Sequence, residues 1–481
     1  MSENLDAVIV GSGPNGLAAA VALAMNGHRV HVLEAQSTFG GGTRSAELVS
    51  PGYVNDLCSA VHPLGISSPF FSSLGLEEHG LEWLNPDIAY AHPLPDNDNG
   101  GAVACFRDLS RTVSTLGTDG GSYRKLFEPF AQKWEELLDD VLRPISFPRH
   151  PLLMARFGLL ATRSLEGLAR AHFSTPAARA LVAGVGAHSM LPLSRSPSAA
   201  VTMMLGTAAH TRGWPIPRGG SQRIADALVA RLRKLGGSLQ PDSPVASLAD
   251  LPPSRVVLFD LTPRQLLKIC GDRLSPAYRS QLEDFRYGPG VFKIDWALSA
   301  PVPWKNPLCA GAGTVHVGGT LEDIARAEQQ AWDGTPPEQP FVLFSQPSVF
   351  DPTRAPPGKH AAWGYCHVPN GSTFNMTSRI EAQIERYAPG FGTTILARAT
   401  ANTAQLELRN ANLVGGDIGG GVADLERLIF RPALRRSPYA VLMTNDPRGF
   451  FICSSSTPPG AGVHGMCGYH AATAARKFLN K

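Results

Sequence analysis

The sequence of 481 residues has little charge and lacks a long hydrophobic run. Charged residues make up 17% of it and the net charge is +3, which is too small an excess to indicate a nucleic-acid partner. No stretch of about eighteen apolar residues occurs, so the sequence predicts no membrane-spanning helix. The N-terminus enters a strand without the basic and apolar regions of a signal peptide, and a cytoplasmic protein is expected.

The sequence also has few cysteines. The seven cysteines are odd in number and widely spaced, and no C-x-x-C pair occurs. This pattern indicates neither a zinc site nor a redox-active disulfide, so no metal is expected and a reducing compartment is the natural setting.

What the sequence does have is length and apolar content. A hydrophobic fraction of 43% predicts a large core, shared by about two domains.

The first thirty-four residues have the pattern of a dinucleotide-binding unit. An apolar strand is predicted over residues 5–10, followed by the glycine turn G-S-G-P-N-G at residues 11–16. An Ala- and Leu-rich helix ends at Gly27, and a second apolar strand closes on Glu34. A glycine turn alone is weak evidence, but strand, turn, helix, strand and acid in this order form the fingerprint of a Rossmann-like nucleotide site.

Each position in this unit has a physical role. Gly11 lets the chain turn off the first strand, Gly13 lets a pyrophosphate approach the backbone, and Gly16 lets the helix pack close to the sheet. The free N–H groups at the helix start favour phosphate, and Glu34 is placed to accept hydrogen bonds from a ribose. The contacts expected from this unit are Gly11, Gly13, Pro14, Asn15, Gly16, Glu34 and Ala35.

A second glycine turn follows the acid and bears on which dinucleotide binds. Gly40, Gly41 and Gly42 are followed closely by Arg44. Nicotinamide dehydrogenases usually run from the acid into an ordinary helix, whereas a second anion-binding turn with a cation suits a longer dinucleotide. FAD is therefore favoured over NAD, with these four residues as further contacts.

The rest of the chain alternates between two patterns. Apolar residues recur at helical spacing from about 122 to 183, with prolines between two helical regions, and strands with helices fill residues 291–391. Strand and helix alternate again over 213–260. We predict an α/β fold in which a Rossmann-like (βαβ) FAD domain of discontinuous segments, 1–75, 213–288 and 422–481, surrounds an inserted α+β substrate domain with an antiparallel sheet plus helices, 76–212 and 289–421.

Three segments bear on the site. Residues 52–71 predict a strand and then a loop leading away from the nucleotide fold. The second helical region contains LLMARFGLLA; hydrophobic core is the favoured interpretation, and an apolar substrate channel or contact with a membrane surface are the alternatives. Near the C-terminus, a strand at 450–453, a glycine-rich turn at 460–468 and a helix over about 465–479 present a second helix N-terminus to the cofactor.

Longer motifs are spread along the chain: VIVGSGPNGLAAA, FGGGTRS, RGGSQRIADAL, VVLFDLTP and TPPGAGVHGMCGYHAA. Together they resemble the phytoene desaturase branch of the flavin amine oxidase superfamily. DLCSAVHPL, GPGVFKIDWAL, YCHVPNGS and NLVGGDIGGG resemble a phytoene dehydrogenase-like subgroup, which includes the animal pyridine nucleotide-disulfide oxidoreductase domain-containing protein 2. The resemblance covers essentially the whole chain and implies FAD held non-covalently. The further contacts expected are Val245, Ser455, Gly462, Val463, His464, Gly465 and Met466.

Two positions depart from the pattern of these relatives. Relatives often have G-G-R after the ribose acid, whereas here the third residue is Gly42 and the arginine is Arg44. The terminal strand runs into three serines at 454–456, where relatives often carry an acid. A hydroxyl or a backbone group must therefore hold the ribityl chain.

The reaction class implied by such a cofactor is hydride transfer from a substrate carbon or amine to flavin N5. Lys293 is a candidate catalytic residue, because amine oxidase relatives hold a water at N5 with a lysine on a comparable strand; the alternative is an ion pair with Asp295 or exposure to solvent. His464 and Tyr469 lie where the flavin is expected, and His62 is placed to approach it from the other side. Plain packing is the alternative for each of these three.

The substrate class stays open between two chemistries. An apolar polyene or lipid-like compound needs a long apolar channel, whereas an amine needs an aromatic cage. We expect a phytoene desaturase-like oxidoreductase that acts on a small apolar substrate, with contact to a membrane surface left open. The alternatives are an amine oxidase-type flavoprotein and a flavin-binding regulatory protein with little turnover.

Overall fold

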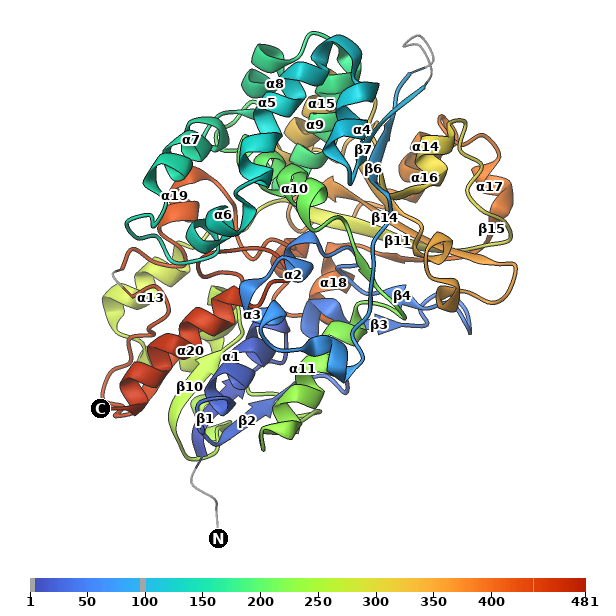
Figure 1. Ribbon diagram of the computed structural model, residues 1–481. Helices are drawn as coiled ribbons and strands as arrows, with labels where there is room; N and C mark the ends of the chain where they lie inside the picture. Colours follow the sequence, from blue (N-terminus) through green and yellow to red (C-terminus); the bar gives the residue numbers. More distant parts are fainter. Residues whose placement is uncertain (1–4, 96–100, 436) are drawn as a thin grey trace.

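The computed structural model describes residues 5–95, 101–435 and 437–481, which form two large sheets, two sheets of two strands each and a layer of helices (Figure 1). The first sheet has five parallel strands in the order β16-β10-β1-β2-β9. Its central strands are apolar at most positions, as expected for a parallel sheet covered on both faces. The strands are β1 (Leu5–Val10), β2 (Val30–Leu33), β9 (Ser238–Gln240), β10 (Ser254–Phe259) and β16 (Gly449–Ile452).

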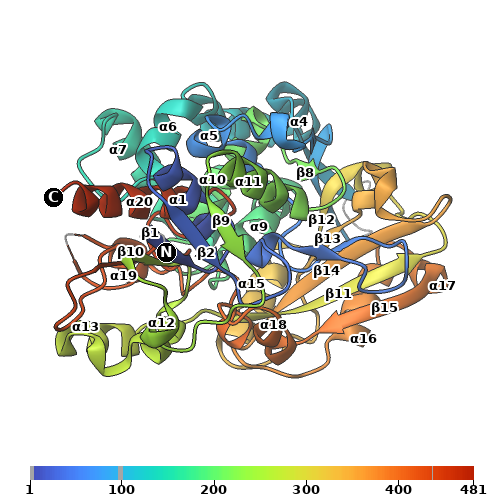
Figure 2. The same ribbon diagram turned by 90° about the horizontal axis from the view of Figure 1, so that it is seen from below.

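Helices cover both faces of this sheet (Figure 2). One face packs against α1 (Pro14–Ala24), α11 (Gln222–Lys234) and α20 (Met466–Leu479). The other face packs against α12 (Pro263–Cys270) and α13 (Pro276–Glu283). This is the doubly wound arrangement in which ligands bind at the carboxyl ends of the strands. The predicted α/β fold with a Rossmann-like domain is confirmed.

The second sheet has seven mostly antiparallel strands in the order β15-β11-β14-β13-β12-β6-β7. Alternate residues of β11 face opposite sides. Phe292, Ile294 and Trp296 join an apolar cluster on one face, while Lys293 and Asp295 lie on the other. The strands are β6 (Ile88–Pro93), β7 (Ala102–Phe106), β11 (Gly290–Leu298), β12 (Ala312–Val317), β13 (Val342–Ser345), β14 (His360–Val368) and β15 (Ile395–Ala401).

The helical pattern predicted over 122–183 is confirmed and extends to residue 211. The predicted proline break lies between α6 and α7, where Pro151 takes the first turn of α7. This layer forms the upper part of the molecule in Figure 1. Its helices are α4 (Leu109–Thr115), α5 (Gly120–Ala131), α6 (Trp134–Val141), α7 (Pro151–Ala161), α8 (Leu165–His172), α9 (Pro176–Gly186) and α10 (Ala199–Thr211).

The other strands and helices connect or cover these layers. They are β3 (Ser45–Ala46), β4 (Asn55–Asp56), β5 (Trp83–Leu84), β8 (Ile216–Pro217), α14 (Pro307–Ala310), α15 (Leu321–Trp332), α16 (Thr377–Glu385), α17 (Phe391–Thr394), α18 (Thr403–Arg409) and α19 (Leu425–Ile429). The loop predicted at the end of 52–71 is wrong. Two helices, α2 (Pro63–Ile66) and α3 (Pro69–Ser72), fold there because each proline fixes a first turn and Ser68 caps the second helix.

Within the described residues, no helix is both long enough and apolar enough to cross a membrane.

Candidate functional site

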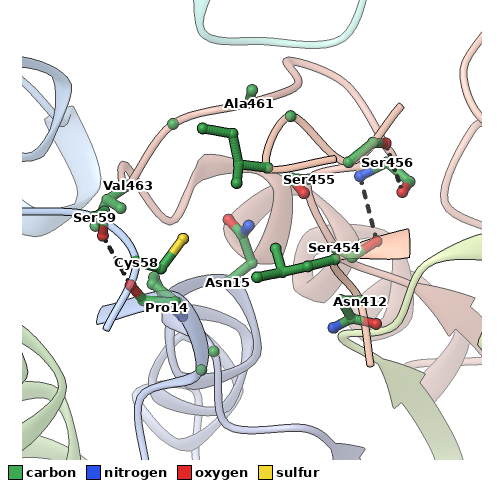
Figure 3. A pocket seen from close by; sticks show the side chains of 18 of the residues that line it. Pro14, Asn15, Cys58, Ser59, Asn412, Ser454, Ser455, Ser456, Ala461 and Val463 are labelled. Atoms are coloured by element: carbon green, nitrogen blue, oxygen red, sulfur yellow. Dashed lines mark hydrogen bonds between the residues drawn. The ribbon is translucent and has the colours of Figure 1, made fainter. Parts of the chain in front are cut away.

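A cavity of about 990 Å³ runs from the carboxyl ends of the five-stranded sheet into the helical layer. It is lined by residues from both ends of the chain and from the seven-stranded sheet. Figure 3 shows Asn15 and Cys58 between the start of α1 and the C-terminal turn that carries Ala461 and Val463. A volume at the upper end of the range for small-molecule sites fits a large cofactor with a substrate beside it.

The glycine turn before α1 is built as its spacing predicts. Gly11 has a φ of +96°, a left-handed conformation that favours glycine. A Cβ on Gly16 would lie 2.2 Å from the carbonyl oxygen of Gly11, so Gly16 serves close packing and does not line the cavity. A Cβ on Gly13 would lie 2.4 Å from a carboxylate oxygen of Asp260. The space beside Gly13 is therefore shared with a side chain from the end of β10.

Asp260 is a member of the site that the sequence pattern did not identify. It follows β10 directly, lines the cavity, and accepts a hydrogen bond from the backbone N–H of Gly16 at 2.9 Å. Burial raises the pKa of Asp260 to about 7, and the nearby Glu34 carboxylate contributes to the increase. The signal available in the sequence was its position at the carboxyl end of a parallel strand.

Glu34 is held in place for ribose binding. One carboxylate oxygen accepts the backbone N–H of Ser12 at 2.9 Å and its hydroxyl at 2.6 Å, and the other accepts the N–H of Gln36 at 3.0 Å. The side chain is 8% exposed and lines the cavity together with Ala35. Three of the four lone-pair sites of the carboxylate are occupied in this way, and one on Oε1 remains for a ribose hydroxyl.

The second glycine turn contributes backbone to the cavity wall. Gly41 and Gly42 line the cavity, whereas Gly40 lies behind it, where a Cβ would be 2.9 Å from the Cβ of Ala225. The Arg44 guanidinium also lines the cavity and donates to the carbonyl oxygens of Gly41, at 3.1 Å, and Arg409, at 2.6 Å. Arg44 therefore braces this turn against α18.

The C-terminal turn supplies the opposite wall. Ser455, Gly462, Val463 and His464 line the cavity, as does Val245 from the first domain. Gly465 and Met466 lie behind it. Gly465 is pressed between α3 and α1, because a Cβ there would lie 2.4 Å from the Phe71 ring and 2.9 Å from the Cβ of Ala18.

The side chains of the three serines at 454–456 have different surroundings. The hydroxyl of Ser454 donates to the carbonyl oxygen of Leu261 and that of Ser456 to the carbonyl oxygen of Gly420, each at 2.8 Å. Ser455 lines the cavity between them (Figure 3).

Unsatisfied polar groups on the wall fit a bound dinucleotide. Asn15 is 5% exposed at the start of α1, and its Oδ1 has no hydrogen-bond partner among the described residues. Arg431 also lines the cavity, and its buried Nε has no hydrogen-bond partner among the residues that the structure describes. Buried polar atoms are nearly always paired, so both indicate a ligand with polar groups. Arg431 was not singled out from the sequence.

The two histidine candidates lie on the cavity wall in neutral form. His62 Nε2 lies 2.8 Å from the hydroxyl of Ser221, which donates its own proton to the carbonyl oxygen of Ser59. His62 therefore donates from Nε2. His464 accepts the N–H of Met466 at its Nδ1, at 3.0 Å. Burial lowers the pKa of each histidine to about 4.

Lys293 and Tyr469 lie away from the wall. Lys293 is 2% exposed and pairs with Asp295, with its Nζ 5.7 Å from the ring centre of Trp363, which does line the cavity. This is the ion pair considered as the alternative from the sequence. Tyr469 is 37% exposed on the outer side of α20, against Phe70. Its expected position near the flavin is therefore wrong, because the phase of α20 turns its side chain outward.

The far end of the cavity is apolar. Side chains of α6, α7 and α10 form its wall, namely Val141, Met154, Phe157, Ala161, Ala200, Val201, Met204 and Leu205. The seven-stranded sheet closes it with Leu343, Trp363 and Tyr365, and the two aromatic rings stack at 5.9 Å with an angle of 13°. The segment LLMARFGLLA thus serves core and cavity together: Leu153 and Phe157 are buried, while Leu152 and Leu159 are 87% and 76% exposed.

Comparisons with known proteins agree with this geometry. A family model, the NAD(P)-binding Rossmann-like domain, matches residues 9–72. A solved putrescine oxidase bound to putrescine has a TM-score of 0.61 at 18% sequence identity, with 100% of both chains covered. Flavin-containing amine oxidase B of Sus scrofa is 32% identical over 146 residues, 28% of each chain. Fold and site together define the class: the chain is an FAD-dependent oxidoreductase with the fold of the flavin-dependent amine oxidases.

Full-length similarity is found to another protein. Pyridine nucleotide-disulfide oxidoreductase domain-containing protein 2 of Mus musculus is 25% identical over 560 residues, covering 98% of this chain and 93% of the relative. A limonene dehydrogenase component of Castellaniella defragrans is 28% identical over 149 residues, 31% of this chain and 26% of the relative.

Proposed function

We propose that this protein is a phytoene desaturase-like dehydrogenase that removes hydride from an apolar, polyene or lipid-like substrate. The observation that carries the proposal is the apolar far end of the cavity, bounded by α6, α7 and α10. A substrate bound there is desolvated without any charge to bury, so the chain has only to position it and exclude water. Bound FAD supplies the hydride acceptor.

The charges of the lining support an uncharged substrate. Among the described lining residues the carboxylates are Glu34, Asp260 and Asp417, and each already accepts backbone N–H groups. None of them lies on α6, α7 or α10, where a substrate ammonium would need a counter-charge. The partial similarity to a limonene dehydrogenase, an enzyme named for a hydrocarbon, points the same way.

An amine oxidase-type flavoprotein is the second candidate. It is favoured by the similarity to amine oxidases and by the stacked rings of Trp363 and Tyr365 on the cavity wall. Such rings attract a cationic amine through their faces.

Anaerobic titration of the FAD-loaded protein separates the two candidates. We expect a colourless isoprenoid polyene to bleach the visible flavin band and putrescine or cyclohexylamine to leave it unchanged. Ala161→Trp, which fills the apolar end, should abolish bleaching by the polyene without releasing FAD. Bleaching by amines alone would overturn the proposal in favour of the amine oxidase, and no bleaching by either class would favour a flavin-binding protein without turnover.

A further inference from the structure

Two histidines meet at the side of the cavity formed by the seven-stranded sheet. His188, in the turn Ala187–Ser189, is half-buried and lines the cavity. Its Nε2 lies 2.9 Å from the Nε2 of His316 on β12, which is fully buried. The turn ends at Met190, a non-glycine residue with a φ of +55° that also lines the cavity. Backbone strain of this kind is retained where the surrounding structure holds a functional side chain in place.

The contact between the two rings fixes their tautomers. Burial lowers the pKa of both histidines, that of His188 to about 3, so both are neutral. One ring must therefore donate a proton to the lone pair of the other. The Nδ1 of His316 is buried without a partner among the described residues, and a bare lone pair there costs less than an unpaired N–H. His316 thus donates from Nε2, and the Nδ1–H of His188 is left as a donor.

A second donor stands next to this pair. Thr314 lies two residues before His316 on the same face of β12 and lines the cavity. Its Oγ1 accepts the indole N–H of Trp214 at 2.8 Å, and no acceptor for its own proton lies among the described residues. The Trp214 ring also packs edge-on against His188, with centroids 6.1 Å apart. Both free donors therefore belong to one cluster on one wall.

We propose that the His188 Nδ1–H and the Thr314 hydroxyl form a binding site for a neutral oxygen atom, the carbonyl or hydroxyl oxygen of an otherwise apolar substrate. The inference rests on the proposed function, because it takes the apolar cavity as the substrate site. Two donors repel an ammonium group, and hydrogen bonds from neutral donors do not offset the free energy of desolvating a full charge. An uncharged oxygen acceptor satisfies both donors, and a hydrocarbon leaves them unpaired.

Limonene and carvone test this inference, since carvone has the same carbon skeleton with one added carbonyl. Their dissociation constants are measured on the FAD-loaded protein by calorimetry under anaerobic conditions. We expect carvone to bind about tenfold more tightly than limonene, as two hydrogen bonds of ordinary strength would provide. His188→Phe and Thr314→Val should each reduce this ratio to about threefold or less.

His172→Phe on α8 is the matched control, because His172 does not line the cavity, and its ratio should equal that of the wild type. Equal binding of the two compounds by the wild type, or an unchanged ratio in His188→Phe, would overturn the oxygen site while leaving the apolar cavity intact. Absence of binding by both compounds would overturn the oxygen site and count against the apolar-substrate function as well.

Discussion

Asp260 sits beneath the first turn of α1, where its carboxyl group accepts the N–H of Gly16. Its pKa rises from an ordinary 3.8 to about 7 on folding. Below pH 4 both the folded and the unfolded chain keep this proton. Between pH 4 and pH 7 only the unfolded chain releases it, so the group lowers stability progressively as the pH rises. Above pH 7 the folded chain bears a buried charge, at a cost on the order of 4 kcal/mol.

Replacing this carboxyl by a neutral isostere should remove the penalty. Asp260→Asn keeps an oxygen for the Gly16 N–H, so we expect a higher melting temperature than the wild type at pH 8 and little difference at pH 4. FAD should also bind more tightly to the variant at pH 8, because a pyrophosphate near α1 no longer meets a like charge. Thermal unfolding and FAD titration at both pH values measure this.

The control is Asp226→Asn on α11, an exposed carboxylate that should change neither quantity. An equal rise in melting temperature for Asp260→Asn at both pH values would contradict a pKa of about 7 for Asp260.

The Lys293–Asp295 pair is buried on the sheet face that looks toward the cavity. Lys293→Met leaves Asp295 as an unpaired buried charge, and we expect a loss of about 3–5 kcal/mol in unfolding free energy. The double variant Lys293→Met/Asp295→Leu should recover most of this, since neither charge then remains. Urea denaturation gives the free energies.

Flavin reduction distinguishes a structural pair from a catalytic lysine. We expect the flavin of the double variant to be reduced by substrate at a rate within about threefold of the wild-type rate, because apolar residues can replace a buried ion pair without disturbing the fold. A stable double variant whose flavin is no longer reduced would instead assign Lys293 to the chemistry.

At the scale of elements, α1 and α20 pack with little space between them. Gly468 on α20 has no room for a side chain, because a Cβ would lie 1.8 Å from the backbone carbonyl oxygen of Asn15. Gly468→Ala must therefore push α20 away from α1, and we expect a loss of about 1–3 kcal/mol or more. The affinity for FAD should fall with it, because Asn15 lines the cavity.

The midpoint of urea unfolding and the dissociation constant of FAD measure these two effects. Thr473→Ala, on an outward position of the same helix, should leave both unchanged. A Gly468→Ala protein with the wild-type midpoint would contradict the close contact.

The elements that sequence reasoning identified are those with strict local spacing. The β1–α1–β2 unit and Glu34 follow from a short fingerprint, and the helices over 122–183 follow from apolar periodicity. The helices α2 and α3 were missed, since four residues are too few to show a period. Tyr469 was misplaced although the small residues Gly468, Ala471, Ala472 and Ala475 mark the inner stripe of α20, which leaves Tyr469 outside it.

Other parts of the site depend on tertiary structure alone. Asp260 reaches α1 because β10 lies beside β1, and their residues are separated by about 250 positions. Arg431 and the His188–His316 pair likewise join segments that no local pattern relates. Such residues can be predicted only when the strand order is known, and that order is set by packing and not by the spacing of residues in the sequence.

At the scale of the whole molecule, α7 forms a wall between the cavity and the surroundings, at the outer edge of the helical layer (Figure 1). Phe147, Leu152 and Leu159 on and before this helix are 85%, 87% and 76% exposed. Grouped exposed apolar side chains mark interaction surfaces, and here they lie outside the apolar end of the cavity. Because an apolar substrate partitions into lipid, a lipid surface is the partner that we expect at these side chains.

We therefore expect the FAD-loaded protein to co-sediment with phosphatidylglycerol-containing vesicles. Leu152→Glu/Leu159→Glu should reduce the bound fraction several-fold, because burial of apolar area drives such binding. Leu408→Glu on α18 is the control, since Leu408 is equally exposed, at 83%, but lies on another helix. Equal bound fractions for all three proteins would contradict a lipid contact at α7.

In the five-stranded sheet β10 lies between β1 and β16, and α1 packs against α20, so elements more than four hundred residues apart share one core. During synthesis α1 leaves the ribosome more than four hundred residues before its partner helix α20. The nucleotide site cannot assemble until residues 466–479 have been synthesised. A chain that stops before residue 466 should leave the intact fingerprint of its first thirty-four residues without a fold, a target for proteases and not a flavoprotein.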